Sequence, residues 1–271
     1  MSTSTTVSRG STERGKRSLG TVTRAGRALD LFTPQQPVWG ATSLARELGV
    51  AKSQAHQMLI SLSEIGLLRR ESGGRYRLGW RTLALGRDML HSQFPDGALQ
   101  PLRQLALRYQ EPVVLMTFDR DKLTVLLRQG SNNDTDPLVP SGGLEGGYAH
   151  CCVMAKCLVA DLPDAERLGI LGRAPKRYTA ATIVDLEQVF IELDRVRAAR
   201  IAFDYGEIHP GLRAVATPLT NLNGDTIAAV GLWTTTSRWE QLGPELTTAV
   251  AGARRRVEAA MRRTGLAGAR G

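Results

Sequence analysis

One short stretch of the chain gathers side chains that can act as nucleophiles or metal ligands. It contains His150, Cys151, Cys152 and Cys157 within an apolar run. A catalytic cysteine needs a nearby base and an exposed, electropositive setting, and structural zinc sites draw on spaced Cys and His pairs. Here the two adjacent cysteines point about 100° apart on a helix, and no CxxC pair exists. The pattern favours buried structural cysteines over two alternatives, a thiol enzyme and a zinc site, and no metal is predicted.

A second group, Asp204, Glu207 and His209, also has acid–base character. A Glu–His pair can transfer protons in catalysis, but the same side chains can close a ligand pocket or cap a strand. No Walker loop or GxGxxG run follows a predicted strand, so no nucleotide site is expected. We predict neither catalytic residues nor a cofactor.

A third group of polar residues has the spacing of a DNA-reading helix. Its members are Lys52, Ser53, Gln54, His56 and Gln57. Each can form a hydrogen bond with a base edge or a phosphate. His56 has two interpretations, as a base reader or as a residue that packs on a phosphate or on the linker.

Two short amphipathic helices are predicted to position these residues. In the first helix, Leu44, Ala45 and Leu48 share one face, while Thr42 is the expected N-cap and Gly49 ends the helix. The buried stripe of the second helix is Ala55, Met58, Leu59, Leu62 and Ile65, and an upstream helix carries Val22, Ala25, Leu29 and Phe32. A recognition helix braced from behind in this way is a helix-turn-helix. We also expect Thr42 to contact DNA.

A basic β-hairpin is predicted to follow as a wing. Leu68, Tyr76 and Leu78 alternate with arginines around the turn at Ser72-Gly73-Gly74, as hairpin strands do. The arginines expected at phosphates or in the minor groove are Arg69, Arg70, Arg75 and Arg77. The segment therefore predicts a winged helix-turn-helix that binds double-stranded DNA. The alternative is a helical hairpin beside a strand hairpin, with charges that are only solvated.

The distribution of charge supports DNA as the partner. The chain has 271 residues and a formal net charge of +9. Residues 1–92 hold 14 Lys and Arg against 6 Asp and Glu, whereas residues 93–271 hold 21 against 20. Positive charge concentrated in one module is the electrostatic signature of DNA binding. A membrane-surface helix would need large apolar residues facing lipid, and here the small core already requires them.

Composition limits the class and location of the protein. The length suits two domains, each with its own core. No run of about 18 apolar residues exists, so no membrane span or membrane partner is predicted. The polar, basic start of the chain lacks the apolar segment of a signal peptide. Three cysteines, an odd number, fit a reducing compartment, and we expect a cytoplasmic protein.

Five segments are predicted along the chain. They are a disordered basic tail (1–19), the winged helix-turn-helix (20–81), a linker helix (82–97), a second domain (98–264) and a frayed tail (265–271). The apolar pattern of the linker starts at Trp80 and reaches His91. A helix in this position transmits orientation better than a flexible tether.

The second domain is predicted to be α+β or α/β, with a sheet and flanking helices. Helices are expected at Leu99–Tyr109, Cys151–Ala160, Ala165–Leu171, Ile183–Ala199 and Pro244–Arg263. Strands are expected at Val113–Asp119, Leu123–Arg128, Ile201–Tyr205, Ala214–Leu219 and Thr226–Thr234, with a type I′ turn at Asn223-Gly224. The long loop Ser131–Gly147 is the expected lid of a small-ligand site.

From Thr21 to Arg262 the chain resembles the IclR-type transcriptional regulators. The resemblance rests on the order and spacing of GVAKSQAHQMLISLSEIGLL, the wing end YRLG, HCCVMAKCLVA, FDYGEIHPGLRAVATPL and NGDTIAAVGLW. It implies an N-terminal winged helix, a linker helix and a C-terminal GAF-like effector-binding domain. It also implies a homodimer or a dimer of dimers that binds operator DNA and responds to a small metabolite, often an organic or aromatic acid.

The resemblance places the effector pocket at seven positions. These are Val153, Met154, Asp204, Leu212, Ala214, Gly231 and Trp233. Gly231 and Trp233 replace small polar residues that often hold a carboxylate in the family, and Ala214 replaces a frequent cysteine. Trp233 either shrinks the cavity or stacks on a planar ligand. We expect an aromatic or larger ligand rather than a small keto acid; an emptied or repurposed pocket, or a Trp233 that is only core, are the alternatives.

The leading hypothesis is a ligand-responsive bacterial transcriptional regulator, either repressor or activator. Its recognition helix carries Gln57 where the family usually has arginine, which favours adenine over guanine. The alternative is a DNA-binding or architectural protein whose second domain serves only oligomerisation. A saturable change of DNA affinity with ligand separates these two hypotheses, and an enzyme is the third.

Overall fold

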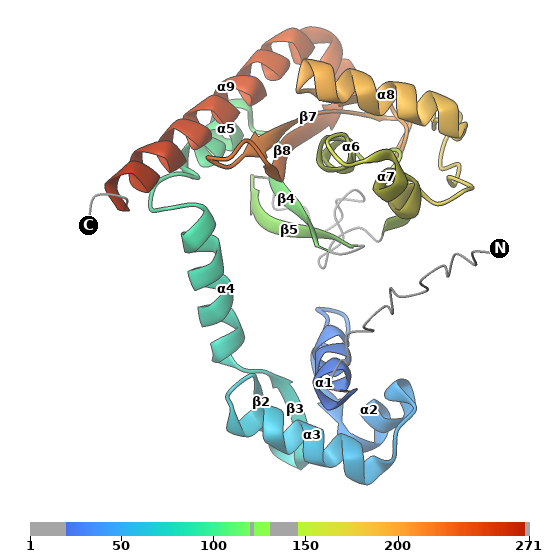
Figure 1. The fold of residues 1–271 in the computed structure, drawn as a ribbon, viewed down its shortest axis with the longest axis vertical. Helices are drawn as coiled ribbons and strands as arrows, with labels where there is room; N and C mark the ends of the chain where they lie inside the picture. The colour runs from blue at the N-terminus through green and yellow to red at the C-terminus, as the bar shows by residue number, and fades with distance from the viewer. Residues whose placement is uncertain (1–19, 120–121, 131–145, 269–271) are drawn as a thin grey trace, which may run out of the picture. The chain divides into compact units, whose positions relative to one another are not determined.

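The computed structural model describes residues 20–119, 122–130 and 146–268 (Figure 1). The chain divides between Ala84 and Leu85 into two units, and each is described by itself. The predicted basic tail, the predicted turn at Arg120-Asp121 and most of the predicted lid loop lie outside the described residues.

The first unit contains three helices and a small sheet. The helices are α1 (Gly20–Asp30), α2 (Ala41–Leu48) and α3 (Lys52–Glu64), and the strands are β1 (Trp39–Gly40), β2 (Leu68–Glu71) and β3 (Arg75–Leu78). All pairs are antiparallel in the order β1-β3-β2. This arrangement confirms the predicted helix-turn-helix and wing. Strand β1 was not predicted, because two residues carry no periodic signal.

The turn between α2 and α3 depends on Gly49. Its φ of 66° is left-handed, and the Val50 amide donates to the Ala45 carbonyl, so the helix ends where predicted. The predicted N-cap at Thr42 is wrong. Gly40 is the N-cap, and Ser43 Oγ accepts from its amide at 3.3 Å. The helix therefore begins at Ala41, one residue before Thr42 and directly after the end of β1.

The core of the first unit follows the predicted stripes, with exceptions at their ends. Its buried residues include Ala28, Phe32, Leu44, Ala45, Ala55, Leu59, Leu62, Leu68 and Tyr76. Ile65 was predicted to be buried but is exposed, as are Val22 and Leu78. Val22 and Ile65 line an apolar groove of about 690 Å³ between α1 and α3, because the two helices do not close on each other there.

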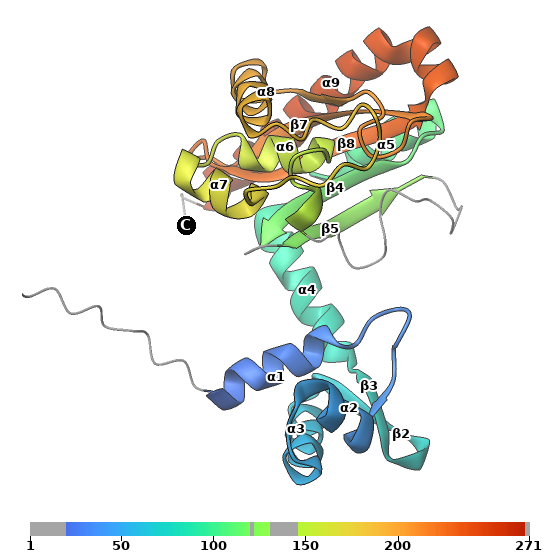
Figure 2. The ribbon, with the colours of Figure 1, turned by 90° about the vertical axis from the view of Figure 1, so that its right-hand side faces the viewer.

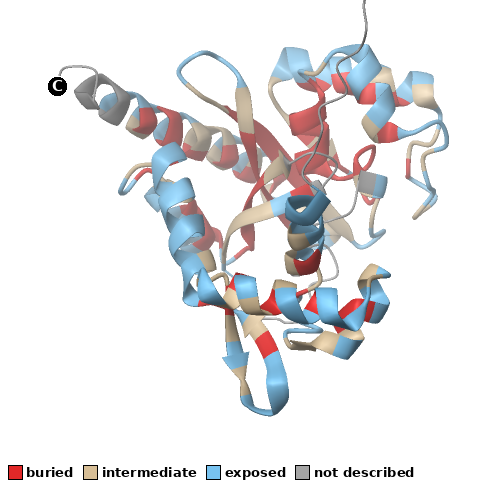
Figure 3. Cartoon of the chain, turned by 60° about the horizontal axis from the view of Figure 1, so that its bottom comes forward, coloured by how far each residue is buried: buried red, intermediate tan, exposed pale blue. Residues whose placement is uncertain are grey.

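Helix α4 (Trp80–Gln93) confirms the predicted linker helix, yet it contains no buried residue. Large apolar side chains lie exposed along it, led by Trp80 at 72% and Leu83 at 66%. In Figure 3 most of this helix has the colour of exposed residues. The helix starts immediately after Gly79, whose amide donates to the Leu67 carbonyl. A Cβ at Gly79 would lie 2.2 Å from the Gly66 carbonyl oxygen, so only glycine fits.

The second unit is built on a five-stranded sheet. Its strands are β4 (Val113–Asp119), β5 (Lys122–Gln129), β6 (Ala202–Asp204), β7 (Leu212–Thr220) and β8 (Thr226–Thr235), in the order β5-β4-β8-β7-β6. Every pair is antiparallel. The unit is therefore α+β, and the α/β alternative is wrong, because the hairpins β4–β5 and β7–β8 leave no parallel neighbours.

Helices cover both faces of this sheet (Figure 2). One face packs against α6 (Val153–Val159) and α8 (Leu186–Ala199), and the other against α5 (Gln100–Tyr109) and α9 (Thr236–Gly268). Helix α7 (Asp164–Leu171) adds Leu171 to the first of these cores. Buried residues concentrate in the strands and on the inward sides of the helices (Figure 3).

Several details of the second unit differ from the sequence prediction. Helices α6 and α8 begin at Val153 and Leu186, two and three residues later than predicted, so Cys151 and Cys152 precede the helix. The link between β7 and β8 is not a type I′ turn, since Asn223 lacks the positive φ that such a turn requires. Residues 221–225 form a longer loop, closed by the Asn221 amide donating to the Asp225 carbonyl. Helix α9 is longer than predicted at both ends, and Pro244 lies inside it rather than at its start.

Among the described residues, no helix has the length and apolar content needed to cross a membrane.

Candidate DNA interface and effector site

The predicted DNA-reading residues share the N-terminal half of α3. Lys52, Ser53, Gln54, His56 and Gln57 are all exposed, while Ala55, between them, is buried in the core. Thr42, in the first turn of α2, is exposed as well. The structure therefore leaves these side chains accessible, while α2 packs behind α3.

The first turn of α3 is open to an anion. Its N-cap is Ala51, which cannot cap with a side chain, and the first backbone bond runs from Ala55 to the Ala51 carbonyl at 3.1 Å. The amide groups of the first turn have no carbonyl partner within the helix. Together with the helix dipole they favour a negative group, such as a DNA phosphate, at this end.

The four wing arginines fall into two pairs. Arg69 and Arg77 are cross-strand partners, and the Nε atoms of both lie within 3.3 Å of Glu71 Oε1. The Arg69 guanidinium also lies 5.4 Å from the ring centroid of Trp80. Arg70 and Arg75 are exposed and form none of the ion pairs found among the described residues. They are the arginines available to a phosphate at the least cost.

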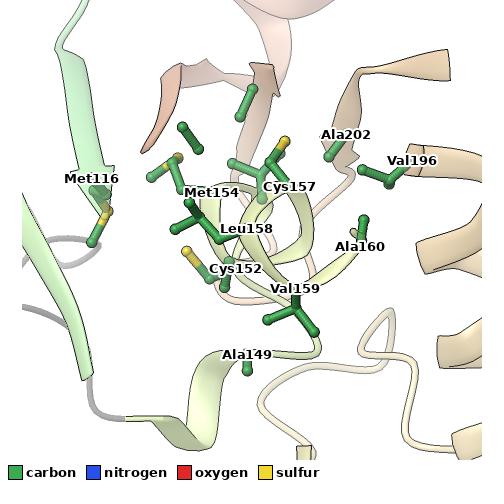
Figure 4. Packing of buried hydrophobic residues seen from close by; sticks show 14 of the residues in the cluster. Met116, Ala149, Cys152, Met154, Cys157, Leu158, Val159, Ala160, Val196 and Ala202 are labelled. Carbon is green, nitrogen blue, oxygen red and sulfur yellow. The ribbon is translucent and has the colours of Figure 1, made fainter. Parts of the chain in front are cut away.

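The residues predicted to line the effector pocket come together on one face of the five-stranded sheet. Asp204, Ala214 and Trp233 form a continuous row, because Asp204 pairs with Ala214 and Ala214 pairs with Trp233. Val153 and Met154 cover this face from α6, and Leu212 packs at its margin. Figure 4 shows Met154 in this core, among the sulfur-bearing side chains Met116, Cys152 and Cys157.

Gly231 is in close contact with α6. A Cβ at this position would lie 2.9 Å from Met154 Sδ and 2.8 Å from both Ala216 Cβ and the Val215 carbonyl oxygen. Real side chains almost never approach so closely, so the space that a small polar residue would occupy is already filled. This position packs α6 onto the sheet in the structure.

Trp233 is buried, with 4% of its surface exposed. The guanidinium of Arg128 lies 5.8 Å from its ring centroid, a distance at which a cation and an aromatic face attract. Arg128 is the cross-strand partner of Val114, which in turn pairs with Gly231. The Arg128 side chain thus borders the predicted pocket. It lies on β5, where no pocket residue was predicted.

A buried ion pair lies at the other end of the row. Lys156 Nζ donates to Glu207 Oε1 and, at 3.3 Å, to the Phe203 carbonyl. Burial raises the pKa of Glu207 to about 7, although Lys156 acts in the opposite direction. Asp204 Oδ1 accepts from the Gly206 and Glu207 amides at 2.8 and 2.5 Å. It therefore organises the turn after β6, and burial raises its pKa as well.

The three cysteines and His150, which were considered for catalysis, lie inside the protein. Cys151, Cys152 and Cys157 are buried and free, and burial raises the pKa of all three, that of Cys152 to about 11. His150 Nε2 lies 2.8 Å from the Lys176 carbonyl, and burial lowers its pKa. Thiols so protonated are poor nucleophiles. In the part of the chain that the structure describes, no three His, Cys, Asp or Glu residues form a metal-binding group.

Comparison with known families identifies the relatives of this fold. Residues 94–259 match the C-terminal domain of the bacterial transcriptional regulator IclR, and residues 21–72 match the IclR helix-turn-helix domain. The chain belongs to the IclR family. It is therefore a ligand-responsive DNA-binding transcriptional regulator, with its effector-binding domain at the C-terminal side, as the sequence resemblance predicted.

Individual relatives in the IclR family cover nearly the same length. The chain is 29% identical over 232 residues to the regulator XynR of Escherichia coli, covering 80% of this chain and 86% of the relative. It is 27% identical to the glycerol operon regulatory protein of Streptomyces coelicolor, over 89% and 96% of the two chains. An IclR homolog from Microbacterium hydrocarbonoxydans, solved with 4-hydroxybenzoate, has the same fold, with a TM-score of 0.78, 21% identity and coverage of 90% and 99%.

Two features of this IclR-family protein were not found by sequence analysis. Arg128 was seen only as the end of a strand, and its place beside Trp233 depends on the order β5-β4-β8. Glu207 was grouped with His209 as an acid–base pair, but it contacts Lys156, whereas His209 is exposed. A lysine within an otherwise apolar helix was the available signal, because a buried cation requires a partner.

Proposed function

We propose that α3 lies in the major groove of operator DNA and that Lys52, Ser53, Gln54, His56 and Gln57 contact bases and phosphates. The observation that carries this proposal is their common exposure on the open N-terminal half of α3. Thr42 and the wing arginines Arg69, Arg70, Arg75 and Arg77 supply contacts to the DNA backbone or minor groove. Arg70 and Arg75 contribute most to these contacts, because Arg69 and Arg77 are already paired with Glu71.

The regulator works as a homodimer or a dimer of dimers. Support comes from α4, which has no buried residue although Trp80, Leu83, Leu85 and Met89 are large and apolar. A helix with such a surface is usually buried against another element. A second copy of the chain can cover it, and a two-fold dimer then presents two α3 helices to successive major grooves, about 34 Å apart.

The effector is an aromatic acid. Support comes from the pairing of an aromatic ring and a cation in Trp233 and Arg128: the indole offers a face for stacking, and a guanidinium binds a carboxylate through two parallel hydrogen bonds. Val153, Met154, Asp204, Leu212, Ala214 and Gly231 form the rest of the site. The effector can change the affinity for DNA only to the extent that it binds one conformation of the protein more tightly than the other.

The protein carries out its role in the cytoplasm and without catalysis. Its free, buried cysteines suit a reducing compartment that also contains the DNA. The raised pKa values of the thiols leave no thiolate for an enzyme mechanism.

Selection of bound sequences from random DNA, followed by anisotropy over a salt series, tests the DNA interface. We expect a palindromic site bound ~10³-fold or more above random DNA, with a steep salt dependence. Uniform weak binding without a preferred site would contradict site-specific regulation. Sedimentation of the Leu83→Glu variant tests the oligomer, since a charge among the exposed apolar side chains of α4 should dissociate it. Gln93→Glu places the same charge at a polar, exposed position of that helix and should not.

Titration of the operator complex with 4-hydroxybenzoate and related benzoates tests the effector class. We expect a saturable change in DNA affinity that Arg128→Gln and Trp233→Leu each abolish. Benzamide, which lacks the carboxylate, is the matched control. An equal response to benzamide, or no response to any aromatic acid, would refute the proposed class.

A further inference from the structure

A hollow of the effector domain lies between α5 and α9, on the face of the sheet opposite Trp233. Its volume is about 740 Å³, within the range of small-molecule sites. It is lined by Gln104, Leu105, Arg108, Tyr109, Glu245, Thr248, Ala249, Gly252, Arg255 and Arg256. Neither the DNA interface nor the effector residues use this groove.

The single carboxylate of the groove already has two partners. The Tyr109 hydroxyl donates to Glu245 Oε1 at 2.7 Å, and Arg108 Nη2 lies 3.2 Å from the same oxygen. Glu245 therefore compensates the charge of Arg108. It offers no charge to Arg255 and Arg256, which line the groove about three helical turns further along α9.

Arg255 and Arg256 converge over Gly252. A Cβ on Gly252 would lie 3.6 Å from Arg256 Nη1 and 3.9 Å from Arg255 Nη2, so both guanidinium groups lie near one point. None of the ion pairs between described residues includes either arginine, whereas the neighbouring Arg254 is paired with Glu258. Two positive charges held close together repel each other, and an anion bound between them would replace this repulsion with attraction.

We propose that the α5–α9 groove binds a small molecule through a phosphate group carrying two negative charges. Two guanidinium groups match such a group in charge and offer several N–H donors in fixed directions. The Thr248 hydroxyl and the Gln104 amide lie along the same groove, and Leu105 and Ala249 provide apolar surface for the rest of the molecule. This domain would then carry a second small-molecule site besides the one at Trp233.

Isothermal titration of the full-length, DNA-free protein with inorganic pyrophosphate, at ionic strength held constant with KCl, tests the site. We expect saturable binding that Arg255→Gln/Arg256→Gln weakens ~10-fold or more. Arg262→Gln/Arg263→Gln removes the same charge from exposed positions of the same helix and should leave the affinity unchanged. Arg75→Gln/Arg77→Gln should also leave it unchanged, which excludes the basic wing as the binding site.

A charge-preserving variant separates geometry from charge. Gly252→Leu would fill the space over which the two guanidinium groups meet, and we expect it to weaken pyrophosphate binding although both arginines remain. Equal affinity in wild type and Arg255→Gln/Arg256→Gln would overturn the proposal, as would equal losses in all three arginine pairs. Dissociation of the oligomer by the groove variant in sedimentation, with no heat of pyrophosphate binding in wild type, would assign the arginines to a subunit interface instead.

Discussion

Lys156 and Glu207 form an ion pair inside the core of the effector domain, with 1% and 8% of their side chains exposed. The pair joins α6 to the turn that follows β6. One oxygen of Glu207, Oε2, is buried and has no hydrogen-bond partner among the described residues. Each of the two buried charges therefore depends on its partner more strongly than a charge in an exposed ion pair does.

Removal of either partner should destabilise the protein. Lys156→Met or Glu207→Leu should each lower the free energy of unfolding by about 3–5 kcal/mol, because one buried group loses its partner. The double variant should lose less than the two single losses combined, which urea unfolding measures. Since burial already raises the pKa of Glu207 to about 7, protonation should reduce the loss of Lys156→Met at pH 5 relative to pH 8. Additive losses independent of pH would contradict the ion pair.

His150 should make stability depend on pH in the acid range. Burial lowers its pKa below the ordinary value of 6.5, so the unfolded chain binds the proton more readily than the folded one. The contribution of neutral His150 to the free energy of unfolding is therefore complete above pH 6.5 and is lost as the pH falls through the lowered pKa. The His150→Gln variant keeps an N–H donor for the Lys176 carbonyl but does not titrate. Its stability should fall less than that of wild type below pH 6.5, and parallel curves would refute the assignment.

A small polar residue at position 231 should be costly. Gly231→Ser places atoms against Met154 Sδ and Ala216 and should lower stability by about 1–3 kcal/mol through overpacking. Met154→Ala frees part of the same space, so it should cost less in the Gly231→Ser background than in wild type. A double-mutant cycle by thermal unfolding measures this coupling, and a coupling near zero would mean that α6 adjusts without Met154.

Gln57 should read one base pair of the operator. Gln57→Ala should weaken operator binding by about 1–3 kcal/mol and relax the preference at one position, since a glutamine amide pairs with adenine in the major groove. Anisotropy on the selected operator and its single-base variants gives both values. An equal loss on operator and random DNA would instead assign Gln57 to the DNA backbone.

The two pairs of wing arginines should differ in their response to salt. Arg75→Gln should weaken operator and random DNA alike and reduce the salt slope by about 1, as the loss of one phosphate contact does. Arg77→Gln should have a smaller effect, because Glu71 holds that guanidinium. Similar slopes for the two variants would show that Glu71 releases Arg77 when DNA binds.

Local patterns predicted most of the elements of this fold. Gly49 marks the end of α2, the stripe from Ala55 to Leu62 marks the face of α3, and the wing strands alternate as expected. Some errors concern caps and turns, such as Thr42 and Asn223, and others lie where packing rather than periodicity decides. Val22 and Ile65 continue a helical stripe but meet an open groove, and only a tertiary structure contains that information.

The effector residues stay a prediction, but the fold shows which of them lie together. Family resemblance found the row of Asp204, Ala214 and Trp233, which the register of β6, β7 and β8 brings together. It did not find Arg128, because no local signal states that β4 and then β5 follow β8 in the sheet. The partner of Lys156 is also set by the fold, since Glu207 is 51 residues away.

The contact between Met154 and Gly231 also constrains how such a site evolves. A serine that arises first at position 231 meets the Met154 sulfur, Ala216 Cβ and the Val215 carbonyl oxygen at under 3 Å, whereas a smaller residue that arises first at position 154 has already removed the contact with the sulfur. The order of the two substitutions therefore matters. Descendants of this protein that acquire a polar residue at 231 should carry a smaller side chain at 154, and the lineage should show the change at 154 as the earlier one.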